Sequence, residues 1–161
     1  MVTAADKKIA NMLRNSGLTL SVAESCSGGL IAKRITDIPG SSRYFLFGAV
    51  TYSNDAKERV LGVPAELIEK YGAVSSEVAL AMAEGVRRVS GSDIAIAVTG
   101  IAGPDGGSPE KPVGTVFIAI ASPEGGKTVL HHLEGDRNAV REATAEAALS
   151  LLLSRFSSPP R

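Results

Sequence analysis

The sequence predicts a single-domain α/β protein, a three-layer α/β/α sandwich with a mixed sheet that includes a C-terminal β-hairpin. Helix and strand signals alternate along the 161 residues, and no segment repeats at a fixed period. The segment "DIAIAVTG" is almost wholly apolar, which is typical of a central strand covered on both faces. The segment "VGTVFIAIASPEGGKTVLHHLEG" is predicted to form two strands around a Pro/Gly turn, and hence an antiparallel hairpin.

The N-terminal part is predicted to fold as helix, strand, helix and strand. "TAADKKIANMLRNSG" has Thr3 as a candidate N-cap, apolar residues at helical spacing and Gly17 as its stop. "LTLSVAE" is predicted to be a short strand, and "GGLIAKRITD" a helix that begins on glycine and ends at the turn "PGSS". A second strand is predicted over "GAVTYS".

Three helices are predicted before the central strand. Asn54 is the candidate cap of "DAKERVLG", Pro64 suits the first turn of "PAELIEKYG", and Ser75 is the candidate cap of "SEVALAMAEGVRRVSG". After the central strand, the loop "IAGPDGGSPEKP" holds three glycines and three prolines, a composition that suits neither a helix nor a central strand. The last helix follows the hairpin and is capped by Asp136, with residues 156–161 expected as a frayed tail of the domain 1–161.

Composition narrows the classes of function. The formal net charge of +0 offers no global field for nucleic acid or an anionic membrane, so we expect a small-molecule substrate. No apolar run approaches the roughly 20 residues that cross a bilayer, and the N-terminus lacks the apolar block of a signal peptide, so we expect a cytoplasmic protein. Cys26 is the only cysteine and there are two histidines, which argues against a disulfide and against a metal site.

Three junctions are expected to meet at the carboxyl edge of the sheet, where ligands collect in folds of this kind. They are "AESCSGG", "TYSNDAK" and "TGIAGPDGGS". In the first, a strand runs into a glycine-rich helix start, which leaves backbone N–H groups free to hold an anion. Ser25 or Ser27 can attack a carbonyl there while N–H groups around Ser27, Gly28 and Gly29 stabilise the oxyanion. The alternative is that either serine only caps the helix.

Lys57 is the candidate proton acceptor for a serine nucleophile. It is predicted in the first turn of a helix, where the dipole disfavours a positive charge, and partial burial would lower its pKa further. Tyr52 lies five residues before it and can relay a proton or orient the amine. The alternatives are an exposed lysine beside Glu58 and a half-buried strand tyrosine.

Cys26 is a second candidate nucleophile, because a helix N-terminus lowers a thiol pKa. A catalytic cysteine usually needs a histidine base, however, and His131 and His132 fall in a predicted strand where adjacent side chains face opposite ways. We therefore interpret Cys26 as a small buried hydrophobe and the two histidines as strand residues rather than metal ligands.

The loop after the central strand matches neither the P-loop nor the dinucleotide fingerprint. Its glycines, including Gly100 and Gly103, let backbone amides approach a ligand, and Thr99 and Ser108 offer hydroxyls. Arg137 begins the last helix, where a cation is useful if it helps that helix N-terminus to bind an anion. An ordinary surface loop and a surface arginine are the alternatives.

With these residues assembled, the sequence resembles the CinA C-terminal domain family, the nicotinamide mononucleotide (NMN) deamidases of bacteria. The resemblance runs from about Ala5 to Phe156. It rests on the segments "AESCSGGLIAKRITDIPGSS", "GAVTYSNDAKERVLGV", "GAVSSEVALAMAEGVR", "TGIAGPDGGSPEKPVGTVFIA" and "GDRNAVREATAEAAL".

The resemblance implies hydrolysis of the NMN carboxamide to nicotinate mononucleotide and ammonia, in pyridine nucleotide salvage, without a metal or organic cofactor. It implies a serine/lysine amidohydrolase, with the serine at Ser25, the lysine at Lys57 and Tyr52 nearby. Ser27 stands where the family commonly has threonine, and Thr99 where serine or threonine is usual. We expect Thr99, Arg137 and the amides of the loop 100–107 to hold the NMN phosphate.

Many members of the family carry this domain behind a larger N-terminal domain associated with competence or with ADP-ribose hydrolysis, and we expect this chain to resemble the stand-alone deamidases. The family often oligomerises, so a homo-oligomer is expected. Two other classes of function remain open at this point. One is a non-catalytic nucleotide-binding module, and the other is an assembly module built on the apolar strands and the long Ala/Leu helix.

Overall fold

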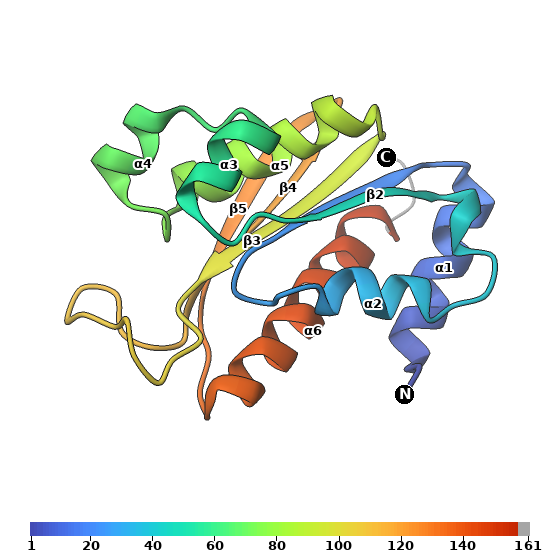
Figure 1. Cartoon of the computed structure of the whole chain (residues 1–161). Coiled ribbons are helices and arrows are strands. Elements are labelled where there is room, and N and C mark those ends of the chain that lie inside the picture. The colour runs from blue at the N-terminus through green and yellow to red at the C-terminus, as the bar shows by residue number, and fades with distance from the viewer. Residues whose placement is uncertain (158–161) are drawn as a thin grey trace.

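A five-stranded mixed sheet lies between two layers of helices in the computed structural model, which describes residues 1–157 (Figure 1). The strands run in the order β2-β1-β3-β4-β5. β1 pairs in parallel with β2 and β3, whereas β4 is antiparallel to both β3 and β5. The predicted α/β/α sandwich with a C-terminal hairpin is therefore confirmed. The strands are β1 (Leu20–Glu24), β2 (Phe45–Val50), β3 (Ile94–Gly100), β4 (Thr115–Ser122) and β5 (Gly125–His132).

Each face of the sheet has its own apolar core. α1, α2 and α6 cover one face, and α3, α4 and α5 cover the other (Figure 1). The central strand β3 is buried over nearly its whole length, as its apolar sequence predicts. No helix within residues 1–157 is both long and apolar enough to span a bilayer. The helices are α1 (Ala4–Ser16), α2 (Leu30–Thr36), α3 (Asn54–Leu61), α4 (Ala65–Tyr71), α5 (Ser76–Ser90) and α6 (Arg137–Phe156).

Helix caps follow the sequence closely, with one correction. The side chains of Thr3, Ser75 and Asp136 accept the backbone N–H bonds that begin α1, α5 and α6, as predicted. The expectation that Asn54 caps α3 is wrong. Ser53 has the extended backbone of a cap and its hydroxyl accepts from the N–H of Ala56, so Asn54 is already helical.

Two boundaries differ from the sequence prediction. β2 begins at Phe45 rather than Gly48 and ends before Thr51, because it is an edge strand whose side chains alternate between half-buried and exposed. The predicted frayed tail covers 156–161, but α6 continues through Phe156. Residues 158–161 lie outside the described part of the chain.

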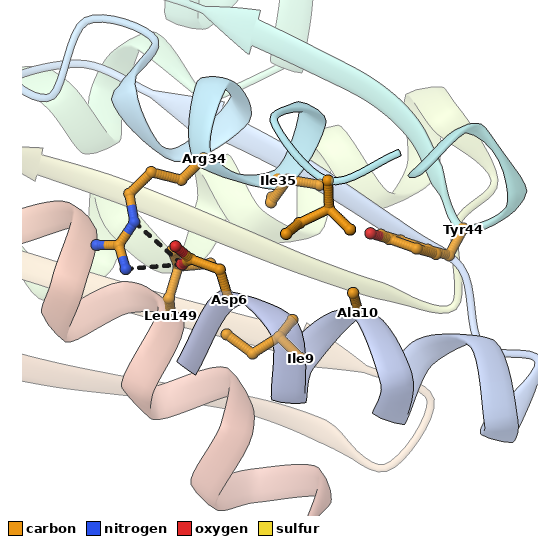
Figure 2. Close-up of a pocket in the computed structure, with 8 residues that line it drawn as sticks. Asp6, Ile9, Ala10, Arg34, Ile35, Tyr44 and Leu149 are labelled. Carbon is orange, nitrogen blue, oxygen red and sulfur yellow. Dashed lines mark hydrogen bonds and ion pairs between the residues drawn. The ribbon is translucent and has the colours of Figure 1, made fainter. Parts of the chain in front are cut away.

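A buried ion pair joins the helices beneath the sheet. The guanidinium of Arg34, on α2, donates to Asp6 on α1, with the shorter of two bonds at 2.7 Å, and pairs with Glu146 on α6 at 2.8 Å. Figure 2 shows the Asp6 carboxylate and the Arg34 guanidinium facing one another beside apolar side chains. The cavity next to them measures about 10 Å³, which leaves room for one water at most.

A close approach of two helices fixes α3 on the other face. Gly85 lies in the middle of α5, where alanine is normally the better helix former. A Cβ at Gly85 would overlap the carbonyl oxygen of Leu61, the last residue of α3. Glycine at this position therefore lets the backbones of α5 and α3 approach closely.

We expect Gly85→Ala to destabilise the protein by roughly 1–3 kcal/mol, because the added methyl forces the two backbones apart. Helix propensity alone predicts the opposite sign, a gain of about 1 kcal/mol. Urea unfolding of the variant measures the difference, with Glu84→Ala on the exposed face of α5 as the control. A stabilised Gly85→Ala protein would show that α3 does not pack this tightly.

Candidate active site

The carboxyl ends of the three parallel strands bring the predicted junctions together. Glu24, at the end of β1, is opposite Val50 of β2 and Val98 of β3. The hydrogen bonding continues past the strand ends, since the N–H of Thr51 donates to the carbonyl of Glu24 at 2.9 Å and the N–H of Ser25 donates to that of Val98 at 3.1 Å. The three segments therefore meet at one edge of the sheet, as expected for this type of fold.

A cavity of about 260 Å³ opens at this edge, close to the lower end of the size range of small-molecule sites. Side chains and loops from both helical layers line it. The predicted site residues that it brings together are Ser25, Tyr52, Lys57, Thr99, Gly100, Gly103 and Arg137. Asn54, Ala73 and Val74 also line it, without having been predicted as site residues, and Asp105 contributes from the predicted loop 100–107.

Lys57 is buried beside Ser25. Its side chain is only 1% exposed, and its Nζ lies 3.1 Å from the Oγ of Ser25. The same amine donates to the carbonyl oxygens of Thr51 at 2.8 Å and Tyr52 at 3.3 Å. None of the ion pairs within residues 1–157 includes Lys57. Burial without a carboxylate partner lowers the pKa of Lys57 below its ordinary value of 10.5.

The local sequence explains this inward lysine. Lys57 and Leu61 are one helical turn apart on the buried face of α3, and Gly62 ends the helix with a left-handed backbone. The Ser53 cap places Lys57 just beyond the first turn, near the positive end of the helix dipole. The sequence-based expectation of an inward, poorly solvated amine thus agrees with the structure.

Cys26 also lines the cavity, but its thiol is unreactive in this environment. Burial raises the pKa of Cys26 to about 11, so at neutral pH the group is a thiol and not a nucleophilic thiolate. His131 and His132 lie on the edge strand β5 and do not line the cavity. The interpretation of Cys26 as a small buried side chain is confirmed.

Ser27, Gly28 and Gly29 form the turn behind Ser25 and do not line the cavity. The Ser27 hydroxyl is fully buried and donates to Glu24, and the Gly28 N–H donates to the carbonyl of Ser25. Both glycines have positive φ angles, of 61° and 101°, which explains why the turn needs two consecutive glycines. The backbone N–H groups of Cys26 and Ser27 have no acceptor among the described residues.

Arg137 and Thr99 hold the walls of the cavity. The Arg137 guanidinium donates to the Tyr52 hydroxyl at 2.9 Å and to the carbonyl of Gly103 at 2.8 Å, so it joins the loop after β3 to the segment after β2. The Thr99 hydroxyl donates to the carbonyl of Ala73 at 2.8 Å. Arg137 is the one arginine among the residues that line the cavity.

Two supporting residues received no role from the sequence. Glu24 is buried behind the Ser25 turn, and Arg141 donates from α6 to the carbonyl of Ser27 at 3.2 Å. The signal for Glu24 was present, because an acidic residue at the end of an apolar strand has to find buried hydrogen-bond donors. Arg141 lies one helical turn after Arg137, but nothing in the local sequence indicates which loop it reaches.

Comparison with known proteins places this fold and these motifs in one family. The model of the CinA C-terminal domain matches residues 2–156. A CinA-like protein of Geobacter metallireducens is 58% identical over 153 residues, which are 95% of this chain and 37% of that protein. The chain thus spans little more than a third of the length of that curated relative.

Solved structures agree in fold over nearly their whole length. The competence damage-inducible protein A from Klebsiella pneumoniae superposes with a TM-score of 0.93 at 33% identity, covering 97% of each chain. The competence/damage inducible protein from Agrobacterium tumefaciens gives 0.88 at 42% identity, covering 96% of this chain and 97% of that one. The chain therefore belongs to the CinA C-terminal domain family.

Proposed function

We propose that this domain is an amidohydrolase that hydrolyses the carboxamide of NMN to nicotinate mononucleotide and ammonia, with Ser25 as nucleophile and Lys57 as general base. The observation that carries the proposal is the 3.1 Å contact between the Lys57 amine and the Ser25 hydroxyl at the edge of a cavity. NMN as the substrate rests on the family resemblance of the motifs. The chemistry of acyl transfer rests on the two side chains themselves.

The hydrogen bonds around Lys57 suit a neutral amine. Such an amine has two N–H donors and one lone pair, and its three partners are the carbonyls of Thr51 and Tyr52 and the hydroxyl of Ser25. The two carbonyls can only accept, so they use both N–H bonds. In the neutral amine that we propose, the lone pair then faces the Ser25 hydroxyl, which is the one partner able to donate a proton.

The reaction starts when Lys57 takes the Ser25 proton as Oγ attacks the carboxamide carbon. The N–H group of Cys26, which lines the cavity and has no acceptor among the described residues, is the donor available to the resulting oxyanion, whereas that of Gly28 already bonds to Ser25. The carbon–nitrogen bond breaks as the Lys57 ammonium returns its proton to the departing nitrogen, which leaves as ammonia. Water then attacks the acyl-enzyme, with the same lysine taking its proton and returning one to Ser25.

Arg137 is suited to hold the NMN phosphate at the opposite wall. Its guanidinium has donors of fixed geometry for phosphate oxygens, and it is already anchored on Gly103 and Tyr52. Thr99 and the amides of the loop after β3 lie on the same cavity and complete the expected anchors.

We expect Ser25→Ala to abolish ammonia release from NMN, and Lys57→Met to lower kcat by about 10²–10⁴-fold with little change in KM, because only the base is lost. Lys57→Arg should not rescue the rate, since a guanidinium keeps its proton. Ammonia and nicotinate mononucleotide are followed together without added metal. NMN binding without ammonia release by the wild type would instead favour the non-catalytic module.

The rate should rise with pH. Only neutral Lys57 can accept the Ser25 proton, so kcat/KM should climb about tenfold per pH unit until the pH passes the pKa of Lys57, which lies below 10.5, and then level off. Cys26, Tyr52, Asp105 and Arg137 are the other titratable groups lining the cavity. A wild-type rate that falls across the same range would contradict a lysine base.

Arg137→Gln should raise KM for NMN by roughly tenfold or more, because a charged hydrogen bond to phosphate is lost. KM for nicotinamide riboside, which lacks the phosphate, should change little. Arg155→Gln is the matched control, since Arg155 is an exposed arginine on the same helix that does not line the cavity. An equal rise in KM for both substrates would remove Arg137 from the phosphate site.

A further inference from the structure

Glu24 is a buried carboxylate without a cationic partner. Its side chain is 1% exposed, and none of the ion pairs within residues 1–157 includes it. Its three partners are all uncharged donors. The Ser27 hydroxyl donates to Oε1 at 2.7 Å, the Ile31 N–H to Oε1 at 2.9 Å and the Ala32 N–H to Oε2 at 3.0 Å. A carboxylate is costly to bury in this way, so its place in the structure calls for a role.

The carboxylate closes the turn that carries Ser25. Glu24 ends β1, and two of its partners are in the first turn of α2, whose cap Gly29 has no side chain to offer. The third partner, Ser27, lies within the turn itself. Glu24 therefore ties the end of the strand to the start of the helix, with Ser25 held between them.

The main chain of Glu24 is connected to the lysine as well. Its carbonyl accepts from the N–H of Thr51 at 2.9 Å, and the carbonyl of Thr51 accepts from the Lys57 amine at 2.8 Å. One residue thus supports both partners, Ser25 through its side chain and Lys57 through the neighbouring strand.

We propose that Glu24 is the positioning residue that sets the distance between the Ser25 hydroxyl and the Lys57 amine. The inference rests on the proposed function of these two groups. It assigns Glu24 no contact with substrate, since Glu24 does not line the cavity. The side chain of Glu24 also occupies the N–H groups of Ile31 and Ala32, the second and third residues of α2, so neither N–H is available to a ligand.

The chemistry of the three donors explains why the residue is glutamate. An ionised carboxylate only accepts, so both of its oxygens suit a nest of N–H and O–H groups. Glutamine would place an NH₂ group against one of those donors, and the turn would have to open to avoid it. Aspartate is one methylene too short to span the turn.

The test compares Glu24→Gln with Asp6→Asn. Asp6 is a second buried carboxylate, 4% exposed, that also bonds to α2, but it does so through Arg34 (Figure 2), and neither of these residues lines the cavity. Both variants should lose stability. Only Glu24→Gln should lose kcat for NMN, by about a hundredfold when assayed well below its Tm, with KM little changed, because a displacement of about 1 Å in the nucleophile costs that much.

A second measurement makes the inference independent of the substrate. A fluorophosphonate reacts with an activated serine, and intact mass follows its rate of attachment to Ser25. We expect this rate to fall in Glu24→Gln in proportion to kcat and to stay at the wild-type level in Asp6→Asn. If wild type leaves NMN intact but is labelled at Ser25 in a Glu24-dependent manner, the substrate assignment fails and the role of Glu24 stands.

Three outcomes would overturn the inference. One is a folded Glu24→Gln protein with wild-type kcat and labelling, and another is an equal loss in Asp6→Asn, which would indicate general destabilisation. A wild type that neither releases ammonia nor is labelled would overturn both this inference and the proposed function.

Should Glu24→Gln fail to fold, Ser27→Ala removes one of the three donors and should lower the labelling rate in the same direction. An unchanged rate would then count against Glu24.

Discussion

The burial of Lys57 without a carboxylate partner is the constraint on which the rest of the site depends. An ammonium in that position has lost most of its hydration, and the protein supplies only two carbonyl oxygens and a hydroxyl in return. The same loss of solvation lowers the pKa of Lys57, which the proposed role of its amine as a base requires. Packing against α5 holds α3 in place despite this cost, because Gly85 lets the two helix backbones approach closely.

The candidate site is held together mainly by hydrogen bonds between its own segments. β3 continues two residues beyond the level at which β1 and β2 end, and hydrogen bonds near this level join Ser25 to Val98 and Thr51 to Glu24. On the far side, two arginines one turn apart on α6 hold different walls, Arg137 the loop after β3 and Arg141 the Ser25 turn. The sheet edge and the Ser25 turn thus form one side of the cavity, and the loop after β3 forms another, held by Arg137 and also by Lys111, whose amine donates to the carbonyl of Tyr71.

The sequence predicted local features and missed the ones made by distant partners. The central strand, the caps Thr3, Ser75 and Asp136, and the hairpin follow from patterns that a short window contains. The cap of α3 was misplaced by one residue because Ser53 and Asn54 are both good caps, and only the backbone decides between them. The predicted start of the edge strand β2 was three residues too far along the chain, at Gly48 instead of Phe45. The side chains of β2 alternate between half-buried and exposed, so no run of fully buried residues marks where the strand begins.

In the candidate site too, the sequence predicted the local features and missed the hydrogen bonds made by distant partners. Ser25, Lys57 and Tyr52 could be named because strand ends converge, and the family motifs point to the same residues. That the Ser27 hydroxyl and the Gly28 N–H are already engaged could not be foreseen, since their partners depend on how the turn closes over Glu24. Direct titration of Lys57 tests best whether its amine is the neutral base that we propose. With ¹³C-labelled lysine and Lys57→Met for assignment, the Lys57 Cε resonance should titrate below 10.5, whereas a Lys57 that titrates at or above 10.5 would contradict the account.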